Sequence, residues 1–301
     1  MNKKITALVS TYNESERIAQ CLESLKWADE IVVVDTESID GTPEIAKKYT
    51  RNVYSVRRTG YACREEAMKY VSNDWLLIID ADELVPVKLM KRLRKIVEED
   101  EADMFYIPRR NYFCGKEMLG AGWGVEQDLQ LRFGKKEFFI AKDVAHEDFT
   151  HKHNARVKII PNLDESIIHL CYYDIEQFIE KTNKYTTFEA ENIFDGKKKE
   201  IGFVKLLFQM LVEETFKRLV IQKGYKDGLE GFTFSLLMVM YRLSAYSKYQ
   251  LMKRFNSKDV RAKVKERYEE IANMNNKEYM HIEPKKGMEK EVEHVLSASV
   301  N

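Results

Sequence analysis

The sequence predicts an α/β protein, with a Rossmann-like mixed central sheet over residues 1–172 and a mostly helical C-terminal region over residues 173–301. Strand and helix patterns alternate as β-α-β-α-β-α-β over the first 80 residues, which is typical of a nucleotide-binding α/β half. Residues 75–79 are apolar without a break, as expected of a strand buried on both faces. From residue 174 onward the apolar residues recur at helical spacing.

Composition narrows the class of protein. Lys+Arg 49 balances Asp+Glu 49 for a formal net charge of +0, which gives no support for a nucleic-acid partner. The cysteines lack C-x-x-C spacing, which indicates reduced thiols of a cytosolic protein and disfavours zinc. No apolar stretch reaches the length of a membrane span, and the N-terminal apolar run is too short for a signal peptide.

Polar residues follow the first two predicted strands. Thr11, Asn13 and Glu14 come after a strand over residues 5–10, and Asp35 closes a strand over residues 30–35. Because parallel strands end at one sheet edge, we expect these groups to converge on a ligand. Asn13 has an alternative interpretation as a helix cap that forms a capping box with Glu16, three residues later.

The central strand ends on Asp80, and Asp82 follows two residues later. Two neighbouring carboxylates repel each other, and a divalent metal that bridges a diphosphate relieves that repulsion. A solvated turn at the end of the strand explains the pair equally well. Arg64, on a helix predicted over residues 61–71, could reach the same diphosphate.

Residues 109–134 are rich in glycine and aromatics, which indicates either a backbone packed close to a ligand or a mobile lid. Glu126 and Asp128 add carboxylates to this segment. His146, beside Glu147, follows it and is a better ligand candidate than a lone histidine.

Two long C-terminal helices are predicted over residues 201–222 and 228–253. Both are strongly apolar, so by default we expect them to pack on the catalytic domain. The alternative is an amphipathic platform in peripheral contact with an anionic membrane.

Residues 9–14, 31–35 and 77–83, together with Gly60 and Arg64, resemble the donor half of GT-A fold glycosyltransferases of family 2. No one of these motifs is specific by itself, but the combination is.

The resemblance continues through residues 122–132, 146–147, 168–169 and 181–186, which are similar to the subgroup containing lipopolysaccharide-core β-glucosyltransferases. It covers residues 4–190 well and the helical remainder loosely.

The resemblance implies a nucleotide-sugar donor, commonly a UDP-sugar, and Mn²⁺ or Mg²⁺ as cofactor. It places Asp80 and Asp82 at the metal with His146, or with His169 in its place. The chain departs from the family pattern at Glu65, where many relatives have asparagine, so the arrangement around the preceding arginine is in doubt. The implied donor-binding set is Thr11, Asn13, Glu14, Asp35, Ser38, Arg64, Asp80 and Ala81.

The resemblance also implies an enzyme that inverts the anomeric carbon, which requires one carboxylate to deprotonate the acceptor hydroxyl. The candidates are Asp128, Glu126 and Glu147, and we favour Asp128 because it follows the glycine-rich segment and matches the acidic position of the family. The alternative functions are a non-catalytic nucleotide-sugar-binding protein and a sugar nucleotidyltransferase. The second usually has a glycine-rich, basic phosphate loop, and residues 10–14 contain neither glycine nor lysine.

The expected acceptor is a glycan, a lipid-linked glycan or a protein in a cell-envelope pathway such as lipopolysaccharide biosynthesis. We expect a cytoplasmic protein, with peripheral contact to the inner face of the plasma membrane as an option. The sequence leaves open whether the chain forms a homo-oligomer.

Overall fold

The computed structural model describes residues 3–57, 66–144 and 147–279, and side chains within these ranges outside 142–144, 147–148 and 275–279. The strands are β1 (Ile5–Thr11), β2 (Glu30–Asp35), β3 (Val53–Ser55), β4 (Trp75–Asp80), β5 (Glu83–Leu84), β6 (Met104–Phe113), β7 (Lys116–Glu117), β8 (Leu129–Lys135), β9 (Phe139–Val144), β10 (Glu147–His151), β11 (Val157–Ile159) and β12 (Ile167–Tyr172). The α-helices are α1 (Ile18–Ser24), α2 (Thr42–Ala46), α4 (Val87–Glu99), α5 (Ile175–Phe194), α6 (Phe203–Phe208), α7 (Leu229–Phe255) and α8 (Val260–Tyr279). Short 3₁₀ helices are η1 (Met68–Tyr70), η2 (Lys136–Phe138), η3 (Leu163–Glu165) and η5 (Gly224–Asp227), and η4 (Gln209–Ile221) is a π-helix.

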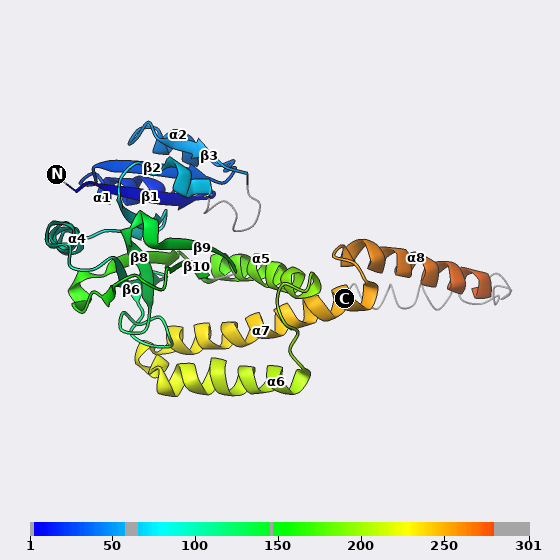
Figure 1. Ribbon diagram of the computed structural model, residues 1–301. Helices are drawn as coiled ribbons and strands as arrows, with labels where there is room; N and C mark the ends of the chain where they lie inside the picture. Colours follow the sequence, from blue (N-terminus) through cyan, green and yellow to red (C-terminus); the bar gives the residue numbers. More distant parts are fainter. Residues whose placement is uncertain (1–2, 58–65, 145–146, 280–301) are drawn as a thin grey trace, which may run out of the picture. The chain divides into compact units, whose positions relative to one another are not determined.

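Ten of the described strands form one mixed sheet, in the order β3-β2-β1-β4-β8-β6-β12-β5, with β7 and β11 both paired to β6. The strands β3, β2, β1 and β4 are parallel, whereas β8 runs antiparallel to β4 and to β6. The strands β9 and β10 form a separate antiparallel pair. Figure 1 shows this sheet followed in the chain by long helices, so the predicted fold class is confirmed.

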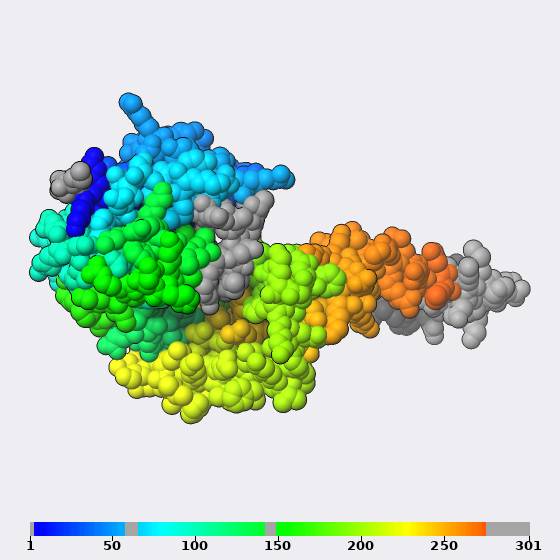
Figure 2. All heavy atoms as spheres, viewed as in Figure 1, coloured from blue at the N-terminus to red at the C-terminus, as the bar shows by residue number. Residues whose placement is uncertain are grey.

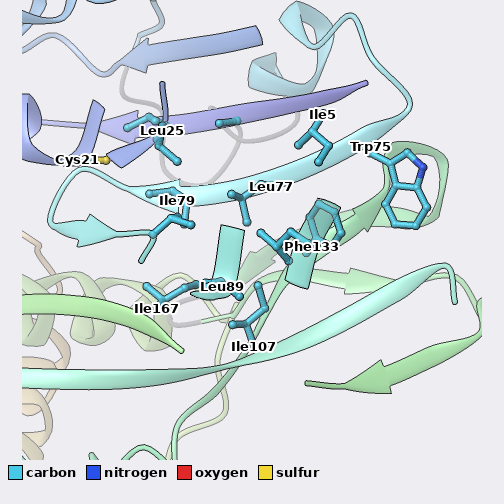
Figure 3. Packing of buried hydrophobic residues seen from close by; sticks show 14 of the residues in the cluster. Ile5, Cys21, Leu25, Trp75, Leu77, Ile79, Leu89, Ile107, Phe133 and Ile167 are labelled. Carbon is cyan, nitrogen blue, oxygen red and sulfur yellow. The ribbon is translucent and has the colours of Figure 1, made fainter. Parts of the chain in front are cut away.

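Both faces of the parallel half of the sheet are buried. Along β4, Trp75, Leu77 and Ile79 join one core cluster, and the alternate residues Leu76 and Ile78 join another. The first cluster also holds apolar residues of α1 and α4, as seen for the labelled side chains in Figure 3. This alternation is what a continuous apolar strand requires when helices or loops cover each face.

Aromatic rings attach the first part of the helical region to the sheet. Phe113, at the end of β6, lies with its ring centroid 4.8 Å from that of Phe234 on α7. Phe178 of α5 lies 5.0 Å from the same Phe234 ring, and Trp123 lies 5.1 Å from Phe113. Edge-on aromatic packing of this kind stabilises beyond the area that it buries. Phe234 therefore packs the helix predicted over residues 228–253 on the sheet-bearing part.

The chain divides into two compact units. The first contains residues 1–189 and 200–245, and the second contains residues 190–199 and 246–301. In the second unit, Tyr249 and Met252 are buried in a small cluster of their own. The domain boundary predicted between residues 172 and 173 stays a prediction. Among the described helices, none combines the length and the apolar character needed to cross a bilayer.

Candidate active site

Three parallel strands end at the same edge of the sheet. In the strand register, Thr11 of β1 pairs with Asp35 of β2, and Ser10 pairs with Asp80 of β4. Acidic groups that are far apart in sequence therefore lie on adjacent strands, at the edge where α/β proteins bind ligands. The register brings these strand ends together as the sequence predicted, although their individual roles stay predictions.

Asp35 has one satisfied and one unsatisfied oxygen. Its Oδ2 accepts a hydrogen bond of 2.9 Å from the backbone N–H of Ser38. Its Oδ1 and the hydroxyl of Thr11 are buried and have no hydrogen-bond partner among the described residues. Because an unpaired buried polar atom costs about 1–3 kcal/mol, two such atoms side by side indicate a place for a polar ligand.

Asn13 connects the loops that follow β1 and β2. Its backbone has a positive φ of 53°, its side-chain oxygen accepts from Ile39 N at 2.9 Å, and its N–H donates to Ser38 Oγ at 2.8 Å. Helix α1 begins only at Ile18 and has no side-chain cap. The capping-box interpretation is therefore wrong, and Asn13 holds the loop beside Asp35 instead.

Asp80 is paired with a buried arginine from the antiparallel part of the sheet. Its Oδ2 contacts Arg132 Nη2, and its N–H donates to Glu83 Oε2 at 2.9 Å. Burial by itself would raise the pKa of Asp80, but the charge of Arg132 outweighs burial and lowers it. Asp80 is therefore ionised at neutral pH and already has a cationic partner.

Asp82 lies opposite His169, and a buried asparagine orients that histidine. Asp82 Oδ1 is 3.5 Å from His169 Nε2, and His169 Nδ1 is 2.7 Å from Asn111 Oδ1. The amide oxygen of Asn111 accepts from Nδ1–H, and Nε2 faces the carboxylate. Burial opposes charge on His169, but Asp82 raises its pKa to about 10, and His169 in turn holds the pKa of Asp82 well below its usual range against the effect of burial.

The same asparagine reaches Asp128, so it links the two carboxylates. Asn111 Nδ2 donates to Asp128 Oδ2 at 2.8 Å, and Arg109 Nε donates to that oxygen, also at 2.8 Å. Burial would raise the pKa of Asp128, but Arg109 lowers it. By contrast, Glu126 is exposed. Asp128 is therefore the better positioned of these two candidate bases.

A chain of alternating charges connects Asp128 with Asp80. Glu83, whose side chain is fully buried, accepts from Arg109 Nη1 and from Arg132 Nη2, each at 3.1 Å. Burial raises the pKa of Glu83, and the two arginines oppose that shift. Sequence reasoning missed the roles of Glu83, Arg109 and Arg132, although Glu83 directly follows the Asp-Ala-Asp turn.

Two further cations lie beside Asp82. Arg17 Nη1 and Lys181 Nζ are each 3.8 Å from Asp82 Oδ2, and Arg17 Nε also donates to Glu14 Oε2 at 2.7 Å. The buried Arg17 guanidinium donates in addition to the backbone oxygen of Leu170 at 2.7 Å, which fixes its position. Positive charge at the sheet edge suits a ligand that carries phosphate.

The remaining predicted residues are placed as follows. Ala81 is buried in the core cluster below the turn. Arg64 and His146 lie outside the described residues, as does the side chain of Glu147, whose backbone begins β10. Within the described part of the chain, no group of three or more His, Cys, Asp or Glu side chains has metal-binding geometry.

The glycine-rich segment packs its backbone against the helical region. The buried Asp227 carboxylate accepts from Leu119 N at 2.6 Å and from Gly120 N at 2.9 Å. A Cβ atom on Gly120 would collide with the backbone of Lys223. The backbone of this segment therefore packs closely against Lys223 and Asp227 of the chain itself, and the predicted ligand contact or lid stays a prediction. Asp128 lies eight residues after Gly120 in the same segment.

The mixed sheet, with acidic side chains gathered at the carboxyl edge of its parallel strands, defines an α/β protein of the kind that binds ligands at that edge. Residues 6–160 match the model of glycosyl transferase family 2. The chain belongs to this family, as the resemblance implied.

The chain is similar to the lipopolysaccharide core biosynthesis glycosyltransferase LpsC of Rhizobium meliloti, at 30% identity over 263 residues that cover 82% of this chain and 92% of LpsC. Among solved structures, it is similar to a mannosyltransferase from Pyrobaculum calidifontis in complex with GDP-Man and Mn²⁺, with TM-score 0.49, 14% identity and coverage of 83% and 88% of the two chains. It is also similar to residues 1–349 of S. aureus TarS in complex with UDP-GlcNAc, with TM-score 0.44, 15% identity and coverage of 84% and 92%.

Proposed function

We propose that the protein is an inverting, metal-dependent glycosyltransferase that moves a sugar from a UDP-sugar to a glycan or lipid-linked acceptor. The observation that carries this proposal is the hydrogen-bonded connection from Asp82 through His169 and Asn111 to Asp128. Through the side-chain amide of Asn111, this connection joins the carboxylate proposed to bind a metal, Asp82, to the candidate base, Asp128. Such a connection suits an enzyme that must coordinate loss of the diphosphate with deprotonation of the acceptor.

The nucleoside would bind at the ends of β1 and β2. Asp35 Oδ1 and Thr11 Oγ1 are buried acceptors that lack partners among the described residues, so they suit the polar edge of a base or a ribose. Asn13 and Ser38 hold the surrounding loops in place. The choice of UDP over other nucleotides rests on the family resemblance.

The diphosphate and its metal would lie beside Asp82. Asp82 would supply a carboxylate oxygen, and His169 would supply its Nε2 once the cation displaces the proton there, a donor pair that suits Mn²⁺ or Mg²⁺ completed by phosphate oxygens. When bound, the cation would neutralise the charge that develops on the departing diphosphate. Arg17 and Lys181 add positive charge at the same place. His146, which lies outside the described residues, stays the alternative ligand.

Asp128 would accept the proton of the acceptor hydroxyl. Arg109 and Asn111 donate to its Oδ2, and Gln130 donates to its Oδ1, so the orientation of the carboxylate is fixed. Because Arg109 lowers its pKa, Asp128 is in the basic form needed for this step throughout the neutral range. Glu126, which is exposed, and Glu147 stay alternatives.

The similarity to LpsC supports an acceptor in lipopolysaccharide core assembly. We propose that the protein works in the cytoplasm at the inner face of the plasma membrane, where nucleotide sugars meet lipid-linked glycans. A protein acceptor is the second option, and a non-catalytic nucleotide-sugar-binding protein is the competing function.

The test is thermal unfolding with a panel of nucleotide sugars, with and without Mn²⁺, followed by measurement of UDP release. A ligand at about 100 times its Kd stabilises by about 2.7 kcal/mol, which corresponds to a rise in Tm of roughly 5–10 °C. Asp35→Ala should lose that rise, whereas Glu126→Gln should keep it. Absence of stabilisation by every nucleotide sugar would contradict a transferase, and stabilisation without UDP release would favour a binding protein.

A further inference from the structure

The segment of residues 203–229, here called the hairpin surface, exposes an unusual number of large apolar side chains. It contains α6, η4, η5 and the first residue of α7, and its atoms lie at the surface in Figure 2, coloured yellow-green to yellow. Scattered exposed apolar residues are ordinary, but a continuous series marks an interaction site. The exposed members include Val204 81%, Leu229 75%, Leu211 67%, Ile221 62%, Phe208 55% and Phe216 53%.

The inward side of the same helices packs within the protein, so the exposed residues are not an unfinished core. Leu206 is buried, and the buried Glu214 carboxylate accepts from Arg218 Nε at 2.5 Å and from Arg242 Nε of α7 at 2.8 Å. These contacts hold η4 against α7 in one orientation (Figure 1). The apolar residues on the outward side are therefore presented by a rigid support.

The charge of the hairpin surface is positive. Its buried acidic residues, Glu214 and Asp227, are bonded within the protein, and Glu213 is half-buried. Residues 203–229 contain five Lys or Arg and three Asp or Glu, which gives the segment a formal net charge of +2, whereas the whole chain has +0. The exposed lysines of the hairpin surface are Lys205, Lys217, Lys223 and Lys226.

We propose that the hairpin surface lies on an anionic lipid bilayer, with its apolar side chains at the boundary between headgroups and acyl chains. An exposed apolar series flanked by lysines has the chemistry of interfacial helices, and each lysine gains from lipid phosphates. No described helix is long and apolar enough to span a bilayer, so the contact is at its surface. A second copy of the chain would bring lysines against lysines, which disfavours a dimer through this face.

This inference deepens the proposed function, because it places the enzyme where a lipid-linked acceptor is found. The hairpin surface contains none of the residues proposed to bind the nucleotide sugar. Vesicle binding and nucleotide binding can therefore fail separately.

The test is flotation of the full chain with vesicles of phosphatidylethanolamine and phosphatidylglycerol, compared with vesicles of phosphatidylcholine alone. We expect binding to the anionic vesicles that weakens with salt. Leu211→Glu should reduce binding at least roughly tenfold, because a charge replaces a large inserted side chain. Lys217→Gln should reduce binding about fivefold at low salt.

The matched control is Val87→Glu, since Val87 is 63% exposed and begins α4, outside the hairpin surface. It should bind the vesicles like the wild type, and every variant should retain stabilisation by UDP-sugar. The proposal is overturned if the anionic vesicles do not bind the chain at low salt, or if Leu211→Glu floats like the wild type. It is also overturned if light scattering shows a dimer that Leu211→Glu disrupts while vesicles do not bind.

Discussion

Replacing Asp227 by alanine should destabilise the fold and loosen the segment that leads to Asp128. The side chain of Asp227 is buried, and its carboxylate accepts the backbone N–H groups of Leu119 and Gly120, at 2.6 and 2.9 Å. The alanine variant would leave both donors without an acceptor, in a place where the hairpin backbone leaves no room to reorganise.

The expected loss follows from these two bonds. Each buried donor left unpaired lowers the free energy of unfolding by about 1–3 kcal/mol, and two donors are affected. Removing a buried charge offsets part of this loss, so the free energy of unfolding should fall by about 3 kcal/mol in all. At 2–4 °C per kcal/mol, Tm should fall by roughly 6–12 °C. Asp227→Asn keeps one acceptor oxygen and should show about half the shift.

Thermal unfolding followed by circular dichroism measures both variants. Glu230→Ala is the control, because Glu230 lies three residues after Asp227, in the first turn of α7, and makes an exposed pair with Lys116, so its removal should leave Tm unchanged. If Asp227→Ala unfolds within about 2 °C of the wild type, the two bonds do not hold the glycine-rich segment and the reasoning fails.

Three other substitutions test the site and the fold. Asp128→Asn should lower kcat by about 10²–10⁴-fold while stabilisation by UDP-sugar is kept, and near-normal turnover would show that the base lies elsewhere. Asp82→Ala should abolish the part of that stabilisation that depends on Mn²⁺, and an unchanged response to Mn²⁺ would rule out this carboxylate as a ligand. Hydrogen bonds from Arg156 and Lys135 hold the pKa of Asp103 well below its usual range, so the stability it provides is complete above pH 5 and lost as the pH falls toward its folded pKa. Asp103→Asn should therefore flatten the decline of unfolding free energy below pH 5, measured by urea titration, and an unchanged slope would contradict this assignment.

Much of the sheet could be predicted because its central strands consist of uninterrupted apolar residues. Residues 75–79 required two buried faces, and both are present. The π-helical form of Gln209–Ile221 could not be predicted, because apolar spacing alone does not distinguish hydrogen bonds to i−4 from those to i−5. Asn13 was misread because its neighbours imitate a capping box, whereas the helix begins later, at Ile18.

The strand-end half of the site was predictable, since parallel strands place their last residues together. The other half comes from β6, β8 and β12, whose order depends on long-range pairing. Asn111 and His169 are opposite each other only because β6 and β12 run parallel in that register. The sequence around Asn111 contains no motif that predicts a hydrogen-bonding link between a histidine and a carboxylate.

The alternating series Asp128, Arg109, Glu83, Arg132 and Asp80 has an evolutionary consequence. Each interior member contacts two residues of opposite charge, so replacing it leaves two charged neighbours without a partner. A second substitution next to the first therefore lowers the free energy of unfolding by less than it would alone. Substitutions here should be strongly epistatic. In related chains, substitutions at these positions should therefore occur in compensating pairs, and single substitutions should be rare.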